Sequence, residues 1–153
     1  MLNPQHALPI ENQGLDPKLF NQVVAITQSI PAHQHLHMHL LSLAPGKARL
    51  QMPTNPAFSN SYGLTHGGLI ATFTDSAMGV ALRTLNLRAV TVEINLNFLV
   101  PVKVDQILTV TAYKVHLGSQ LVVAEAEVFN PDKKLVAKSR ATFYRVGKLL
   151  DSV

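Results

Sequence analysis

The segment Gly68–Leu82 constrains the fold more than any other part of this 153-residue chain. Its sequence, GLIATFTDSAMGVAL, contains a single ionisable residue, Asp75, and helical spacing puts apolar side chains at every angle around the axis. A helix that is apolar on all sides is buried on all sides. Because one sheet covers one side only, we expect a sheet that wraps strongly around this helix, or a second subunit over the remaining side, or both.

The carboxylate of Asp75 has no partner of opposite charge within this helix. Its neighbours on the helix surface, three and four positions away, are Ala71, Thr72, Met78 and Gly79. Aspartate is rarely buried unless it is paired or functional, so Asp75 is a candidate catalytic carboxylate. The structural alternative is a carboxylate that backbone or hydroxyl donors such as Thr72 or Ser76 satisfy.

The glycine pair at the start of the helix is the second candidate feature. Gly67 and Gly68 present backbone amides at the positive end of the helix dipole, where an oxyanion or a polarised carbonyl binds well, although a tight entry into the helix also explains such a pair. Gly68 and Asp75 are separated by about 10 Å of helix rise. A reacting carbon lies about 3 Å from both its oxyanion donors and its nucleophile. If both features serve one reaction, they come from two chains whose helices run antiparallel at a dimer interface.

The composition favours a homo-oligomer. The chain is 47% apolar and 14% charged, against roughly 25% charge in an ordinary domain, and interfaces between subunits are depleted in charge. The two long uncharged runs, 19–46 and 50–74, are broken by proline and polar residues, so we expect no membrane association. The net charge of +4 is spread over several segments, which predicts no nucleic-acid partner. With no cysteine and no recognisable signal peptide, a cytoplasmic protein is expected.

The pattern along the chain predicts one α+β domain at 16–148 behind an irregular tail at 1–15. Asp16 and Pro17 are typical of a helix start, and Pro31 is expected to stop that helix. From His33 the period changes to two, which predicts a strand with four histidines on one face. Further strands are expected at 48–52, 90–98, 107–117, 121–129 and 135–146. About six strands and one long helix predict an antiparallel sheet packed on that helix.

These motifs together resemble the hotdog-fold acyl-CoA thioesterases, most closely the phenylacetyl-CoA-type (PaaI-like) group. The resemblance runs from about residue 36 to 144 and rests on Asn60, on His66-Gly67-Gly68 followed by Asp75, on VTVEIN at 90–95 with Pro101 beyond it, and on a terminal Ala-x-Phe. It implies a curved antiparallel sheet wrapped around a long central helix, and dimers with a continuous sheet that often pair into tetramers.

The resemblance also implies an activity and a set of site residues. Acyl-CoA would be hydrolysed without a metal or cofactor, with Asp75 as general base or nucleophile. The amide of Gly67, helped by Gly68, would polarise the thioester carbonyl of a substrate bound to the other chain. Asn60 would position the carbonyl or the water, and Thr91 would lie near the partner's acid. His66 is expected to be a structural element of the turn, while Leu64 and Phe73 line an acyl pocket or pack in the core.

Three alternatives remain open from the sequence. The same scaffold serves as a non-catalytic acyl-CoA or lipid-binding module, or as a hotdog hydratase or dehydratase, which would need a histidine paired with an acid. His33, His35, His37 and His39 on one strand face form a possible metal site. An edge facing solvent or another subunit is the simpler interpretation of these histidines, because no carboxylate lies between Asp16 and Asp75.

Overall fold

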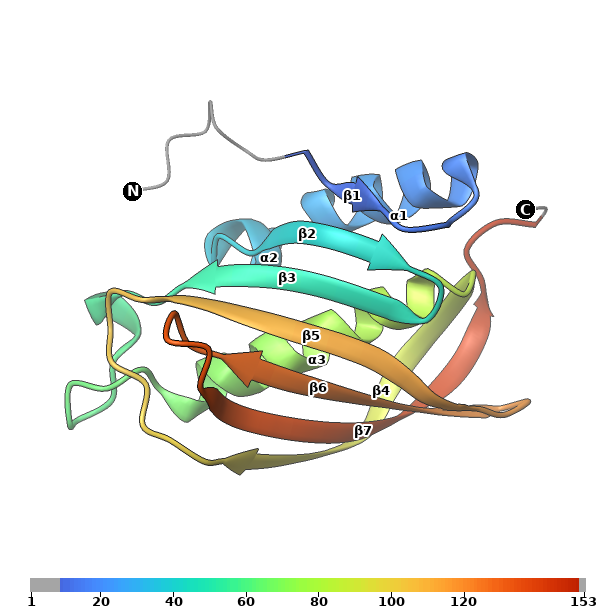
Figure 1. Ribbon diagram of the computed structural model, residues 1–153. Coiled ribbons are helices and arrows are strands. Elements are labelled where there is room, and N and C mark those ends of the chain that lie inside the picture. Colours follow the sequence, from blue (N-terminus) through green and yellow to red (C-terminus); the bar gives the residue numbers. More distant parts are fainter. Residues whose placement is uncertain (1–8, 152–153) are drawn as a thin grey trace.

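The computed structural model describes residues 9–151 and contains one curved sheet that wraps around a single long helix, α3 (Figure 1). The strands follow the order β1-β2-β3-β5-β6-β7-β4 across the sheet. Their bounds are β1 Glu11–Asn12, β2 His39–Ala44, β3 Lys47–Pro53, β4 Leu87–Phe98, β5 Ile107–Leu117, β6 Leu121–Phe129 and β7 Leu135–Lys148. The helices are α1 Pro17–Ser29, α2 Pro31–His35, the 3-10 helix η2 Pro56–Phe58 and α3 Gly67–Arg83.

The predicted α+β architecture is confirmed, with the sheet wrapped around the central helix. The strands expected at 107–117 and 121–129 begin and end where predicted. The sheet differs in one respect, because it has seven strands and is mixed: β1 pairs with β2 in parallel, while the other pairs are antiparallel. The pair Glu11–Asn12 lies inside the segment expected to be an irregular tail, and Leu15 just after it is buried in the core.

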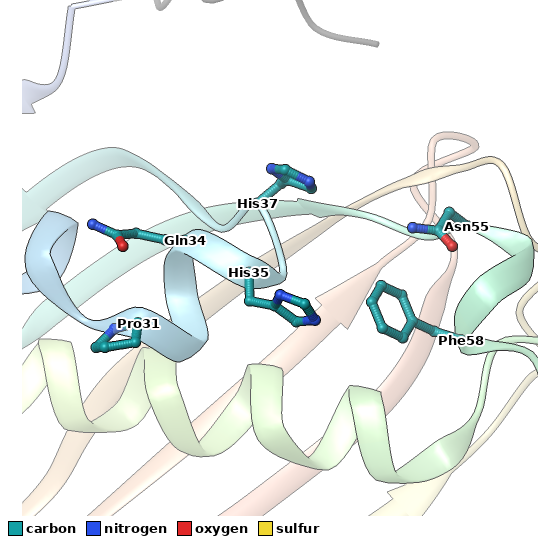
Figure 2. Close-up of a pocket in the computed structure, with 6 residues that line it drawn as sticks. All are labelled: Pro31, Gln34, His35, His37, Asn55 and Phe58. Atoms are coloured by element: carbon teal, nitrogen blue, oxygen red, sulfur yellow. The ribbon is translucent and has the colours of Figure 1, made fainter.

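The predicted strand from His33 is wrong. Pro31 stops α1 but also occupies the first position of a second, short helix, α2, where its fixed φ is favourable. His33 and His35 lie on α2, His37 adopts a positive φ of 51° in the turn that follows, and β2 begins at His39. The four histidines therefore do not share one strand face, as Figure 2 illustrates for His35 and His37. Within residues 9–151, no cluster of His, Cys, Asp or Glu has the geometry to hold a metal ion.

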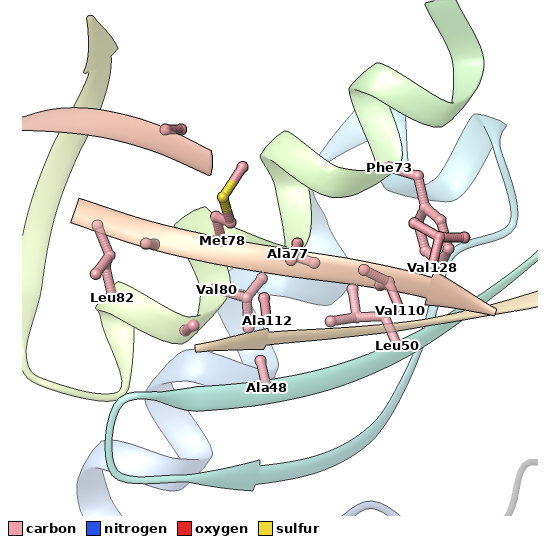
Figure 3. Close-up of a cluster of buried hydrophobic side chains, with 14 of the residues drawn as sticks. Ala48, Leu50, Phe73, Ala77, Met78, Val80, Leu82, Val110, Ala112 and Val128 are labelled. Carbon is pink, nitrogen blue, oxygen red and sulfur yellow. The ribbon is translucent and has the colours of Figure 1, made fainter. Parts of the chain in front are cut away.

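The core lies between α3 and the concave face of the sheet. Phe73, Ala77, Met78 and Val80 from the helix are fully buried there, opposite Leu50 and other apolar residues from β3, β5 and β6 (Figure 3). Each large apolar side chain buried in this way contributes about 1.5–3 kcal/mol to the free energy of folding. Among residues 9–151, none of the helices combines the length and hydropathy needed to span a bilayer.

One stripe of α3 is left uncovered by its own chain, although the sequence predicts burial on all sides. The stripe follows helical spacing along Gly68, Thr72, Asp75, Ser76, Gly79 and Arg83, all of which retain solvent exposure. Strand β4 lies beside it at the end of the sheet and pairs with β7 alone among the described strands. Its side chains Val90 and Val92 are more than half exposed. The stripe that α3 leaves open therefore lies beside exposed apolar side chains of β4, and its cover by a second subunit stays a prediction from the sequence.

Candidate active site

Asp75 lies in the middle of the uncovered stripe of α3 and is held by Thr91. The hydroxyl of Thr91 donates a hydrogen bond of 2.7 Å to Oδ1 of Asp75. Among residues 9–151 this is the one hydrogen bond to the carboxylate, so Oδ2 has no protein donor there. Asp75 is only partly buried in the single chain. Thr91 contacts the aspartate of its own chain, and its expected placement near a partner's acid stays a prediction.

The two glycines at the start of α3 differ in the hydrogen bonds of their backbone amides. His66 is the N-cap, and its Nδ1 accepts a hydrogen bond of 3.0 Å from the amide of Gly68. That amide is therefore occupied, which corrects the expectation that Gly68 assists Gly67. The amide of Gly67 has no acceptor within the described chain. His66 is thus the N-cap of α3, and its expected part in the site stays a prediction.

A close contact explains why a glycine stands at 67. A Cβ at this position would lie 2.9 Å from Cζ of Phe98, at the end of β4. Phe98 itself is 55% exposed. Sequence reasoning missed Phe98, because it lies far from Gly67 along the chain and no local pattern links the two. The contact between Phe98 and Gly67 forms only when the chain has folded.

Asn60 organises the loop that leads into α3. Its Oδ1 accepts hydrogen bonds from the amides of Tyr62 and Leu64, at 2.9 and 3.1 Å. This is an Asx-type turn, which fixes the side chain. Its Nδ2 has no acceptor among the described residues and remains available as a donor.

The two residues expected to line an acyl pocket differ in burial. Leu64 is half-buried and forms an isolated β-bridge with Lys103. Phe73 is fully buried in the core, which supports core packing rather than a pocket lining for Phe73.

The single chain does not bring all the predicted site residues together. Asp75 and Thr91 are joined, and Asn60, His66 and Gly67 surround the start of α3. Gly67 and Asp75 are eight residues apart on one straight helix, which separates them by about 12 Å of rise. A single thioester carbonyl cannot reach the amide and the carboxylate of the same chain.

A cavity between α2 and η2 is a separate feature. It has a volume of about 560 Å³ and includes an edge-to-face contact between the rings of His35 and Phe58 with centroids 6.2 Å apart (Figure 2). Its lining consists of Pro31, Gln34, His35, His37, Asn55 and Phe58. None of the predicted catalytic or substrate-binding residues lines it.

Known proteins are similar to this chain in both sequence and fold. The family model for the thioesterase superfamily matches residues 62–137. The mouse protein named acyl-coenzyme A thioesterase 13 is 33% identical over 106 residues, which cover 67% of this chain and 76% of the relative. The Escherichia coli acyl-coenzyme A thioesterase PaaI is 28% identical over 85% of this chain and 93% of its own. Its crystal structure superimposes with a TM-score of 0.83, at 27% identity over 88% and 98% of the two chains.

A third relative was solved in altered forms. Structures of a hypothetical thioesterase from Streptococcus pneumoniae, with an aspartate or a threonine replaced by alanine, match with TM-scores of 0.71 and 0.70. Each is 25% identical and covers 72% of this chain, and 92% and 91% of the relative. Together the matches define the class: the chain belongs to the thioesterase superfamily, with the hotdog fold. Within that superfamily it is a thioester hydrolase of the PaaI-like group.

Proposed function

We propose that this protein hydrolyses acyl-CoA thioesters to the free acid and CoA, with Asp75 as the catalytic carboxylate. The observation that carries the proposal is the hydrogen bond from Thr91 to Oδ1 of Asp75 on the uncovered stripe of α3. The bond orients the carboxylate and leaves Oδ2 to face a substrate or a water. The names of the mouse and E. coli relatives support acyl-CoA as the substrate class.

The pairing of Asp75 with Thr91 has a parallel among the relatives. In the S. pneumoniae thioesterase, the replaced aspartate and threonine are 16 positions apart, which is also the separation of Asp75 and Thr91. The parallel supports a joint role for these two side chains. It favours Thr91 as a positioning residue for Asp75 within one chain.

In the proposed reaction, Asp75 takes a proton from a water whose oxygen adds to the thioester carbonyl carbon. The C–S bond then breaks, and the CoA thiolate leaves and takes up that proton. In the nucleophilic form of the reaction, Asp75 attacks the carbonyl carbon itself, the C–S bond breaks and the CoA thiolate leaves. Water then hydrolyses the mixed anhydride to the free acid and Asp75, and the thiolate takes up a proton from that water. In both forms the carbonyl oxygen gains negative charge, which the free amide of Gly67 would stabilise and Nδ2 of Asn60 would help to position.

The Gly67 amide in this reaction would come from a second copy of the chain. The separation of about 12 Å between Gly67 and Asp75 along α3 rules out one chain as the source of both. The uncovered stripe of α3 and the exposed apolar edge of β4 supply a self-complementary surface for such a copy. A dimer with antiparallel α3 helices would place each Gly67 beside the partner's Asp75. A tetramer built from two such dimers and a cytoplasmic location stay predictions from the sequence.

The direct test measures thiol release from a panel of acyl-CoAs by the wild type and by Asp75→Asn. Loss of a catalytic acid or base costs about 10²–10⁴-fold in rate, so we expect kcat to fall by that factor while the melting temperature changes little. Asp105→Asn is the matched control, because Asp105 is exposed in a left-handed turn that asparagine tolerates. It should retain full activity.

Two results would reject the proposal in favour of an alternative. Binding of acyl-CoA without turnover, in the wild type and in Asp75→Asn alike, would identify a binding module. Hydration of an enoyl-CoA by the wild type would identify a hydratase. The hydratase has little support here, because Nδ1 of His66 accepts a hydrogen bond from the Gly68 amide and, within the described residues, is not paired with an acid.

A further inference from the structure

A second cavity lies at the C-terminal end of α3 and contains two arginines. It has a volume of about 470 Å³ and lies where α1, α3, the start of β4 and the C-terminal segment meet. Its lining consists of Ile26, Arg83, Arg88, Ala89, Val90, Val146 and Leu149. No acidic side chain is among them. The cavity therefore combines two guanidinium groups with apolar walls, which is the composition of an anion-binding pocket.

Neither arginine is used by the fold. Within the described residues, Arg83 and Arg88 make no ion pair and donate no side-chain hydrogen bond, whereas the ion pairs of this protein involve Lys138 and Arg140 on the convex face of the sheet. Arg88 is exposed, but Arg83 is half-buried, and this burial lowers the pKa of its guanidinium. A desolvated cation without a partner is costly for the folded chain.

A structural role for Arg83 as a helix cap is excluded by the hydrogen bonds at the end of α3. The last carbonyls of a helix lack partners within it, and a basic side chain often supplies them. Here each has another donor. Thr84 N donates to Val80 O (3.3 Å), Thr84 Oγ1 to Ala81 O (2.6 Å), Leu85 N to Leu82 O (3.0 Å) and Asn86 N to Arg83 O (2.9 Å).

Two buried polar atoms on the neighbouring helices α1 and α2 also lack hydrogen-bond partners among the described residues. Oγ1 of Thr27 and Nδ1 of His33 have no hydrogen bond, although both residues are 4% exposed. The pKa of His33 is lowered chiefly by burial and further by the positive charge of Arg83, whereas a hydrogen bond with the backbone of Thr27 raises it. Thr27 follows Ile26 of the cavity wall. A half-buried cation without a partner, in a cavity with apolar walls and a second arginine, favours a ligand site over a packing role.

The cavity lies within reach of the proposed catalytic carboxylate. Arg83 is eight residues from Asp75 along the uncovered stripe of α3, about 12 Å of rise. Arg88 precedes Thr91 by three residues on β4, about 10 Å along the strand. The pantetheine arm of CoA is a long, extended chain that bridges such a gap between a thioester and its nucleotide. Arginine binds phosphate oxygens through two parallel N–H donors, which makes it the residue best suited to that end of the ligand.

We infer that Arg83 and Arg88 bind the phosphate groups of the CoA part of the substrate. This inference rests on the proposed function, since it assumes that the thioester lies at Asp75. It also divides the substrate contacts on α3 and β4 into two groups. Asp75 and Thr91 contact the thioester end of the substrate, and the two arginines bind its nucleotide end.

The test compares one acyl group on two carriers. The preferred acyl-CoA of the panel and the same acyl group on pantetheine, which lacks every phosphate, are assayed with the wild type, Arg88→Gln, Arg83→Gln and the control Arg49→Gln. Arg49 is exposed on β3, away from the cavity. Loss of a charge-assisted contact predicts a KM about tenfold higher for acyl-CoA in Arg88→Gln, with kcat and the KM for acyl-pantetheine unchanged. Arg49→Gln should match the wild type.

Equilibrium binding separates this inference from the proposed function. Calorimetric titration with CoA, with 3′,5′-ADP and with inorganic phosphate should show that Arg88→Gln weakens CoA and 3′,5′-ADP about tenfold. That result in a protein that hydrolyses no thioester would support the arginine site and reject the hydrolase.

Four results would overturn the arginine site. One is equal affinity of CoA for all variants, and another is an equal loss of activity on both thioesters. The third is an Arg88-dependent site for inorganic phosphate that CoA does not occupy. The fourth is dissociation of the oligomer in Arg88→Gln, which would assign Arg88 to the subunit contact.

Discussion

The two long faces of α3 have the same helical backbone but different surroundings. One face, with Phe73, Ala77 and Met78, is fully buried against the sheet. The other, with Thr72, Asp75 and Gly79, keeps solvent exposure and carries the hydrogen bond from Thr91. The apolar character of the helix therefore has two origins. The sheet accounts for one face, and the uncovered face requires a partner or a substrate.

Core truncation on the buried face gives the largest expected effect. Phe73→Ala removes a fully buried ring and should lower the free energy of unfolding by about 3–5 kcal/mol. Thr72→Ala, one residue away on the uncovered face, should change it by less than about 1 kcal/mol, because the exposed hydroxyl bonds only the backbone of Gly68. Urea unfolding monitored by circular dichroism measures both. Similar losses for the two variants would contradict the division of α3 into two faces.

A bulky side chain on the uncovered face, as in Gly79→Leu, should weaken the association of subunits rather than destabilise the single chain. A Cβ at Gly79 would meet nothing within 4 Å in the single chain, so a side chain at this position begins in open space. Against a second α3 the leucine would be overpacked by about 1–3 kcal/mol, which weakens association roughly 5–150-fold. Sedimentation velocity over a range of concentrations checks this, with Gly79→Ala as the small-residue control. An unchanged association constant for Gly79→Leu would remove α3 from the proposed interface.

The smallest expected effect is the pH dependence of stability that arises from the buried His33 on α2. The pKa of the buried His33 is lowered from its usual 6.5, chiefly by desolvation, so the folded state prefers the neutral ring. The unfolded chain binds the proton first as pH falls, and stability that is complete above pH 6.5 is lost below it. His33→Leu should flatten this dependence in melting curves recorded from neutral pH downward. The exposed His37→Asn should keep it, and a slope equal to the wild type in His33→Leu would contradict the assignment.

Some elements were predictable because their signals are local. The alternation and turn residues of 107–129 define β5 and β6 to the residue. The histidine run failed for a physical reason: an i, i+2 pattern over a few residues carries little energy, and Pro31 starts α2 before a strand forms. The strand β1 was missed because two residues with no apolar pattern pair only through the backbone of β2.

The candidate site shows the same limit. The motif residues Asn60, Gly67 and Asp75 could be named from the sequence, but the direction of Thr91 could not. β4 is exposed on both faces, and its pairing with β7 shifts by a bulge between Thr91 and Glu93, so alternation does not define which face meets α3. The pairing of Thr91 with the buried Phe143 of β7 places it on the concave side.

The sequence by itself determined that a nearly uncharged helix with one acid would be the centre of the molecule, because the cost of exposing apolar surface is the same in any fold. It determined the amide-rich helix start as well, through the intrinsic geometry of His66, Gly67 and Gly68. The tertiary structure decided which face of that helix stays open, which hydroxyl holds Asp75, and that Arg83 and Arg88 share a cavity. These are contacts between distant segments, and their energies exist only once the chain has brought the segments together.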